Sequence, residues 1–179
     1  MDILQRAKNI KMMVFDVDGT LTDGSVYVGV QGEMMKAFNV KDGLGIGLAL
    51  QNGFKVALVT GRKSEMLLKR AQELGVSEIY QGVSDKVSVL KDICVKHDIK
   101  IEEVAFMGDD LNDFMAMQKV GLACVPNDAA GDVKQVAHYV TAENGGKGAA
   151  RAFIEYILKA QDVWQKAVQS YVNKGYGTQ

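Results

Sequence analysis

The chain has little of what marks secreted, membrane-spanning or nucleic-acid-binding proteins. Its 179 residues include two cysteines, two histidines and one proline, and two cysteines are too few for a disulfide scaffold. Its apolar runs are too short to span a membrane, and residues 1–11 lack the apolar stretch of a signal peptide. The net charge of −1 indicates no basic surface for nucleic acid. We therefore expect a cytoplasmic protein that binds neither membranes nor nucleic acids.

The rare cysteine and histidine side chains indicate no function of their own. Cys94 and Cys124 have apolar neighbours, so we expect reduced core residues, and a disulfide or a metal pair is the alternative. His97 and His138 have no partner at metal-ligand spacing, and we assign neither a role. Apolar residues make up 47% of the chain, enough for one packed core. The length predicts a single domain over residues 1–179.

Five short apolar runs predict the strands of the fold. None of them alternates polar and apolar residues, which is typical of strands buried on both faces of a parallel sheet. Helical patterns separate the runs; one starts near Ser64 and ends at Gly75, and another has Ser84 as its N-cap. The alternation predicts an α/β fold with a Rossmann-like, doubly wound parallel sheet. The predicted strands are residues 12–15, 56–59, 104–107, 122–125 and 139–140, and further predicted helices are residues 43–52, 150–158 and 164–171.

Two segments depart from this alternation. Residues 23–39 contain two short apolar stretches on either side of Gln31 and Gly32. They predict a β-hairpin that projects from the sheet soon after the first strand. At the other end of the chain, a C-terminal helix and a flexible tail are expected over about residues 162–179.

Polar clusters follow the first three of these apolar runs, residues 12–15, 56–59 and 104–107. The carboxyl ends of parallel strands meet at one edge of a sheet, and ligands bind there. Lys86, near a helix start, precedes the third of these clusters in sequence. We therefore expect all of these side chains to converge on one site. The clusters are Asp16 and Asp18; Thr60, Gly61 and Arg62; and residues 108–113, which include Asp109, Asp110 and Asp113.

Clustered carboxylates repel one another, and packing alone does not explain them. Mg²⁺ prefers hard oxygen ligands in octahedral geometry, so it would remove the conflict. Asp16 and Asp109 could supply two of these ligands from neighbouring strands. The alternative is that the aspartates are helix caps and turn residues, as Asp often is.

Phosphoryl transfer suits these residues. A carboxylate such as Asp16 can attack phosphorus and form an aspartyl-phosphate. Asp18 could protonate the leaving oxygen and then deprotonate the water that hydrolyses the intermediate. Lys86 would offset negative charge, and the Thr60 hydroxyl would donate to a phosphoryl oxygen. The sequence therefore predicts a magnesium-dependent phosphatase.

The motifs resemble those of the haloacid dehalogenase superfamily. The run Asp16-Val17-Asp18-Gly19-Thr20 matches its DxDGT motif. Thr60, Lys86 and a GDxxxD pattern at residues 108–113 follow in the same order. The resemblance implies a nucleophile at Asp16 and a general acid/base at Asp18.

The same resemblance implies a ligand set for Mg²⁺. Asp16, the backbone carbonyl of Asp18, and Asp109 would bind the ion. Asp113 would be a supporting carboxylate, and Asp110 could assist.

Cap domains, which cover the site in many members, have no room in this chain. The stretch from Asp18 to Thr60 holds only the hairpin and one helix, and the stretch from Lys86 to Asp109 is also short. We expect a member without a cap. Because such a site is open to water, association of subunits could supply the cover.

Longer segments resemble the family of 3-deoxy-D-manno-octulosonate 8-phosphate phosphatases, over almost the whole chain to Arg151. The resemblance implies a homotetramer in which hairpins of four subunits associate and a neighbour helps to form each site. It also implies a role in making lipopolysaccharide precursors. The segments are residues 22–24, 38–43, 60–63, 80–82 and 108–111.

Arg62 favours this family over its relatives that act on nonulosonate 9-phosphates, where Glu is typical after the Thr-Gly pair. A guanidinium can pair with the carboxylate of a sugar acid; a surface ion pair is the alternative for Arg62. Lys41 and Asp42 are further candidates for contact with the sugar.

Two other functions differ in class from a phosphatase. A phosphomutase shares the first chemical step, but it usually needs a cap to exclude water. A non-catalytic binding subunit would tolerate loss of Asp16, Asp18, Lys86 or Asp109, and the chain has all four.

Overall fold

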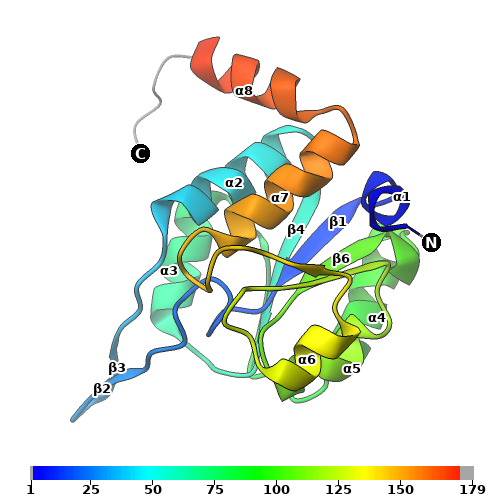
Figure 1. Cartoon of the computed structure of the whole chain (residues 1–179). Coiled ribbons are helices and arrows are strands. Elements are labelled where there is room, and N and C mark those ends of the chain that lie inside the picture. The colour runs from blue at the N-terminus through cyan, green and yellow to red at the C-terminus, as the bar shows by residue number, and fades with distance from the viewer. Residues whose placement is uncertain (1, 174–179) are drawn as a thin grey trace.

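The computed structural model describes residues 2–173, which form a parallel six-stranded sheet with strand order β5-β4-β1-β6-β7-β8 (Figure 1). The five predicted strands are confirmed, and β5 was missed. Its residues are only half-buried and include Glu78 and Gln81, so this edge strand lacks an apolar run. The strands are β1 Met12–Phe15, β4 Lys55–Thr60, β5 Glu78–Gln81, β6 Val104–Met107, β7 Leu122–Val125 and β8 Tyr139–Val140.

Helices cover both faces of the sheet, as the continuous apolar strands predict. Met13 and Phe15 of β1 face one layer, and Met12 and Val14 face the other. Helices α1, α2, α3, α7 and α8 contribute to the first core, and α4, α5 and α6 to the second (Figure 1). The helices are α1 Ile3–Lys8, α2 Val40–Gln51, α3 Glu65–Leu74, α4 Lys86–His97, α5 Phe114–Met117, α6 Gly131–Val136, α7 Ala149–Ala160 and α8 Trp164–Asn173, with 3₁₀ turns η1 Ile101–Glu103 and η2 Leu111–Asp113.

Capping side chains set where the helices near the site begin. Helix α3 starts next to Ser64, as predicted; Ser64 is its N-cap, and its hydroxyl accepts a hydrogen bond from the Leu67 N–H. The prediction of Ser84 as the cap of α4 was wrong. Asp85 takes that place, because its carboxylate accepts from two N–H groups of the first turn. Helix α2 begins at Val40, three residues earlier than predicted, and Asn39 is its N-cap.

The predicted hairpin is confirmed. Strands β2 Tyr27–Gly29 and β3 Gly32–Met35 pair antiparallel in a separate two-stranded sheet, which projects from the body of the molecule (Figure 1). The described residues hold no cap domain and no helix long and apolar enough to cross a membrane.

Residues 174–179, where a flexible tail was predicted, lie outside the described part. Cys124 is buried, Cys94 is half-buried, and both are free thiols. Cys124 is therefore a core residue as predicted, whereas Cys94 is only partly buried.

Candidate active site

The polar clusters meet at the carboxyl ends of β1, β4 and β6. Strand β1 lies between the other two, and the chain runs from β1 to β4 on one side before returning to β6 on the other. This is the topological switch point at which doubly wound sheets bind ligands. Asp16 directly follows β1, and its N–H donates to the Met107 carbonyl at 2.8 Å, which extends the pairing with β6.

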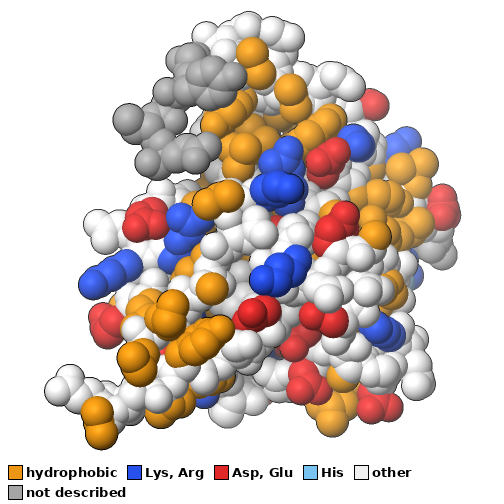
Figure 2. Space-filling view, turned by 60° about the vertical axis from the view of Figure 1, so that its left-hand side comes forward, with side chains coloured by type: hydrophobic (Ala, Val, Ile, Leu, Met, Phe, Trp, Pro, Cys, Tyr) orange, Lys and Arg blue, Asp and Glu red, His pale blue; other side chains and the backbone are white. Residues whose placement is uncertain are grey.

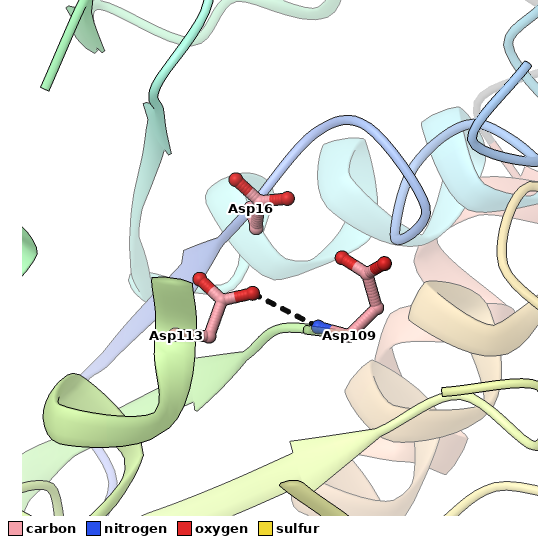
Figure 3. A group of neighbouring side chains, drawn as sticks. All are labelled: Asp16, Asp109 and Asp113. Carbon is pink, nitrogen blue, oxygen red and sulfur yellow. Dashed lines mark hydrogen bonds between the residues drawn. The ribbon is translucent and has the colours of Figure 1, made fainter. Parts of the chain in front are cut away.

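Three carboxylates converge at this edge. Oxygens of Asp16, Asp109 and Asp113 lie within 4.8 Å of one another, and Figure 3 shows the Asp16 and Asp113 side chains facing the same space beside Asp109. Burial, together with the neighbouring charge of Asp113, raises the pKa of Asp16 to about 6. Burial and the charges of Asp16 and Asp113 raise the pKa of Asp109 to about 8.

Lys86 neutralises part of this charge. Its Nζ, at the start of α4, lies 2.6 Å from Asp16 Oδ1 and 2.5 Å from Asp113 Oδ1. Burial alone would lower the pKa of this ammonium, but the two carboxylates outweigh it and the pKa is raised. Lys86 therefore stays charged and holds the Asp16 carboxylate in one orientation.

Asp113 orders the loop after β6. Its side chain is fully buried, and its Oδ2 accepts from the Asp109 N–H at 3.0 Å (Figure 3). Since Oδ1 accepts from Lys86, Asp113 joins the loop after β6 to the ammonium.

Gly19 permits the close approach of Asp109 to the loop after β1. Its φ is +88°, and a Cβ at this position would lie 2.0 Å from Asp109 Oδ2. Only glycine fits here, because any side chain would displace a carboxylate of the cluster.

The donor set fits Mg²⁺. Three carboxylates face one ammonium, and burial together with the neighbouring carboxylates raises the pKa of Asp16 and of Asp109. A cation bound by both would stabilise their charged forms. Magnesium prefers one or two carboxylates and retains several waters. Asp16, Asp109 and the backbone carbonyl of Asp18 would hold the ion, with Asp113 behind them.

The other predicted residues lie around this centre. Thr60 is buried at the end of β4, and its hydroxyl accepts from the Arg62 N–H at 3.3 Å across Gly61. Arg62 is half-exposed, and its Nε lies 3.7 Å from Asp18 Oδ2. The structure thus brings Arg62 to the predicted acid/base.

Of the three remaining predicted residues, two accept hydrogen bonds from backbone groups and one has no such contact. Asp42 is buried and accepts from the N–H groups of Gly148 and Arg151, at 3.3 and 2.8 Å. This carboxylate caps α7 and is not free for a sugar. Lys41 is exposed on the first turn of α2 and makes no side-chain contact among the hydrogen bonds and ion pairs of the described residues. Asp110 is exposed and accepts from the Leu111 N–H.

Sequence reasoning missed two residues of the hairpin. The Lys36 ammonium forms an ion pair with Asp18 and lies 3.1 Å from Glu33 Oε1. Glu33 accepts a hydrogen bond from the Ser64 hydroxyl. These are the only charged residues between Gly24 and Asn39. Two charged residues in an otherwise uncharged hairpin were the feature of the sequence that could have indicated a role for them.

The glycine run before α7 supports the site from behind. A Cβ at Gly145 would lie 1.8 Å from the Gly19 carbonyl oxygen, and the Gly145 N–H donates to Asp128 at 2.9 Å. This run is a helix-entry loop packed against the loop after β1.

Comparison with known proteins agrees with this geometry. Residues 75–153 match the haloacid dehalogenase-like hydrolase family. The 3-deoxy-D-manno-octulosonate 8-phosphate phosphatase of Yersinia pestis is 44% identical over 161 residues, which cover 90% of this chain and 86% of the relative. The Escherichia coli K12 phosphatase of the same name is 44% identical over 160 residues, covering 89% and 85%.

A solved structure extends the likeness to the fold. The phosphatase of the same name from Moraxella catarrhalis, in complex with magnesium ion, phosphate ion and KDO, has a TM-score of 0.91 and 39% identity. The match covers 94% of this chain and 97% of that one. The chain belongs to the haloacid dehalogenase-like hydrolases and, among them, to the family of the 3-deoxy-D-manno-octulosonate 8-phosphate phosphatases.

Proposed function

We propose that this chain, a phosphoric monoester hydrolase by family, converts 3-deoxy-D-manno-octulosonate 8-phosphate into the free sugar acid and phosphate, in lipopolysaccharide precursor synthesis. The observation that carries the proposal is the convergence of Asp16, Lys86 and Asp109 at the β1–β6 edge, in a chain 44% identical to phosphatases of that name. The Moraxella relative was solved with magnesium, phosphate and KDO together.

In the first step, an Asp16 carboxylate oxygen attacks the phosphorus of the ester. The bond between phosphorus and the leaving oxygen breaks, and Asp18 gives its proton to that oxygen. Lys86 keeps Asp16 ionised and aligned from 2.6 Å, and the Thr60 hydroxyl donates to a phosphoryl oxygen.

In the second step, water attacks the phosphorus of the aspartyl-phosphate. Asp18 takes the proton from that water, the bond to Asp16 breaks, and phosphate leaves. Mg²⁺, when bound by Asp16, Asp109 and the Asp18 carbonyl, supplies positive charge against the phosphoryl oxygens.

Arg62 supports a sugar acid as the leaving group. Its guanidinium stands 3.7 Å from Asp18 Oδ2, on the side where the leaving oxygen must lie. A guanidinium pairs well with a carboxylate. A nonulosonate 9-phosphate also carries a carboxylate and is the second candidate substrate.

The hairpin supports a homotetramer. Six of its apolar side chains are exposed, Val30 at the tip fully so, and Figure 2 shows apolar side chains along the projection at the lower left. Isolated two-stranded hairpins are marginal in water, so an apolar one favours association. The exposed set is Val26, Tyr27, Val28, Val30, Met34 and Met35.

We also propose a cytoplasmic location. The two thiols of the chain are free, and reducing compartments keep thiols in that state.

A substrate screen with Mg²⁺ tests the function. We expect the highest kcat/KM for 3-deoxy-D-manno-octulosonate 8-phosphate, ahead of the nonulosonate 9-phosphate, neutral sugar phosphates and an aryl phosphate. Asp16→Asn should abolish turnover of all of them while the fold persists. A higher kcat/KM for the nonulosonate would overturn the substrate, and turnover by Asp16→Asn would overturn the nucleophile.

A further inference from the structure

Four charged side chains close a ring at the mouth of the site. Lys36 contacts Asp18 and Glu33, and Arg62 lies 3.7 Å from the same two carboxylates. Positive and negative groups alternate around this charge ring, so its net charge is zero. Two of its members come from the hairpin and two from the sheet edge.

Glu33 is the member that phosphate chemistry does not explain. Positive potential at the mouth of a site attracts an anionic substrate. Glu33 lies beside Lys36 and Arg62, and its negative charge reduces that potential. Support of the fold does not explain the residue either. Ser64 caps α3 through its own bond to the Leu67 N–H, and that bond does not involve Glu33.

On the side that faces the cations, Glu33 makes ion pairs but no hydrogen bond. Its Oε1 is buried and has no hydrogen bond of acceptable geometry among the described residues, although Lys36 Nζ lies 3.1 Å away. Its Oε2 is fixed by the Ser64 hydroxyl. The Ser64 hydroxyl therefore holds Oε2 in place, and a competing carboxylate could replace Oε1 as the partner of the two cations.

Lys36 is the stronger partner for such a carboxylate. Its side chain is only 2% exposed, and a charge-assisted bond is stronger where water is excluded. Because Asp18 must reach the leaving oxygen, a cation in contact with Asp18 lies beside the leaving group.

We propose that Glu33 occupies the position of the substrate carboxylate: it neutralises Lys36 and Arg62 until the sugar acid arrives and takes over both cations. Lys36 and Arg62 then bind the substrate carboxylate. Because Glu33 competes for the same two cations, it lowers the affinity of the site for that carboxylate. The inference rests on the proposed function, since it requires a phosphorylated sugar acid as substrate. It makes the hairpin part of substrate selection as well as of assembly.

The two hairpin residues then have opposite effects on selectivity, defined as kcat/KM for 3-deoxy-D-manno-octulosonate 8-phosphate divided by kcat/KM for a neutral hexose 6-phosphate. Glu33→Gln removes the competitor, so selectivity should rise about threefold, the scale of a partly exposed ion pair. Lys36→Met removes a buried cation, so selectivity should fall about tenfold or more. Lys36→Arg should restore part of it.

A ratio is the right readout because Lys36 also contacts Asp18. Loss of that contact slows both substrates alike and cancels in the ratio, as does any change in attraction for the phosphate itself. Glu65→Gln and Lys69→Gln make the same charge changes at exposed positions of α3. They should leave selectivity at the wild-type value, and circular dichroism checks that every variant is folded.

The outcomes separate this inference from the proposed function. A wild-type protein that does not prefer the sugar-acid phosphate overturns both. If the wild type prefers it, an unchanged or lower selectivity of Glu33→Gln overturns the inference alone, because a merely structural Glu33 would affect both substrates equally. Unchanged selectivity of Lys36→Met has the same consequence.

Discussion

At the scale of single residues, the site depends on carboxylates forced closer than their charges favour. Asp16, Asp109 and Asp113 share one small space, and one ammonium contacts two of them. The local backbone makes this possible, because Gly19 leaves room for Asp109 where a side chain would collide with it. Charge repulsion is thus stored at the point where a cation can relieve it.

Gly19→Ala should lower the affinity for Mg²⁺ at least tenfold. Its Cβ would lie 2.0 Å from Asp109 Oδ2, so this ligand must move. Titration calorimetry with MgCl₂ measures the change. Gly75→Ala is the matched control, because it has a similar φ of +74° but no atom within 4 Å of its Cβ. Equal affinities for the two variants would contradict the steric role of Gly19.

At the scale of elements, strand ends and helix starts bring distant side chains together. Asp42 of α2 accepts from the Arg151 N–H of α7, 109 positions along the chain, and these two helices pack side by side (Figure 1). The first turn of α7 has no cap of its own, since Gly148 offers no side chain. The Asp42 side chain therefore links α2 to the start of α7.

Asp42→Ala should destabilise the protein by about 1–2 kcal/mol, because it leaves two N–H groups at the start of α7 without their acceptor. Urea denaturation measures the loss. Asp92→Ala, at an exposed position of α4, should change stability by less than about 0.5 kcal/mol. A stable Asp42→Ala with a raised KM would instead restore Asp42 to the sugar site.

The proposed assembly depends on the hairpin. Val28 and Met34 are 70% and 65% exposed, so lysine at either position leaves the chain's own core intact but would place charge in the proposed apolar contact between subunits. Light scattering should show a smaller assembly for Val28→Lys and Met34→Lys. Val95→Lys, at an 84% exposed position on α4, should keep the wild-type mass. Unchanged masses for the hairpin variants would exclude it as the interface.

At the scale of the whole molecule, the acid cluster links stability to pH and metal. Folding raises the pKa of Asp16 to about 6 and of Asp109 to about 8, from an ordinary value of 3.8. The metal-free folded state therefore binds these protons more tightly than the unfolded chain does. Their contribution to stability is full below about pH 4 and is lost as the pH rises to about 8.

Mg²⁺ should consequently raise the melting temperature more at pH 8.5 than at pH 5.5. At pH 5.5 the ion must displace protons from both carboxylates, and at pH 8.5 it meets ionised ligands. Melting curves with and without MgCl₂ test this. In Asp109→Asn the shift at pH 8.5 should largely disappear. A shift independent of pH in the wild type would argue against Asp109 and Asp16 as ligands.

The layered fold and the order of the motifs could be predicted from the amino-acid sequence. Apolar runs such as residues 104–107 are local patterns, and their lack of alternation already implies a strand buried on both faces. Asp16, Thr60 and Asp109 were predicted to converge because each follows such a strand. Edge strand β5 escaped this reasoning, because an edge needs less burial and its residues are mixed.

Which polar side chains contact one another could be seen only in the three-dimensional structure. Asp42 was predicted to contact the sugar because of its motif. The packing of α2 against α7 instead lets its carboxylate accept hydrogen bonds from backbone N–H groups. Glu33 and Lys36 had no motif, but the fold of the hairpin brings them to Asp18 and Arg62. Apolar periodicity acts over a few residues and is visible in sequence. Contacts between charges depend on how whole elements pack, and so they appear only in three dimensions.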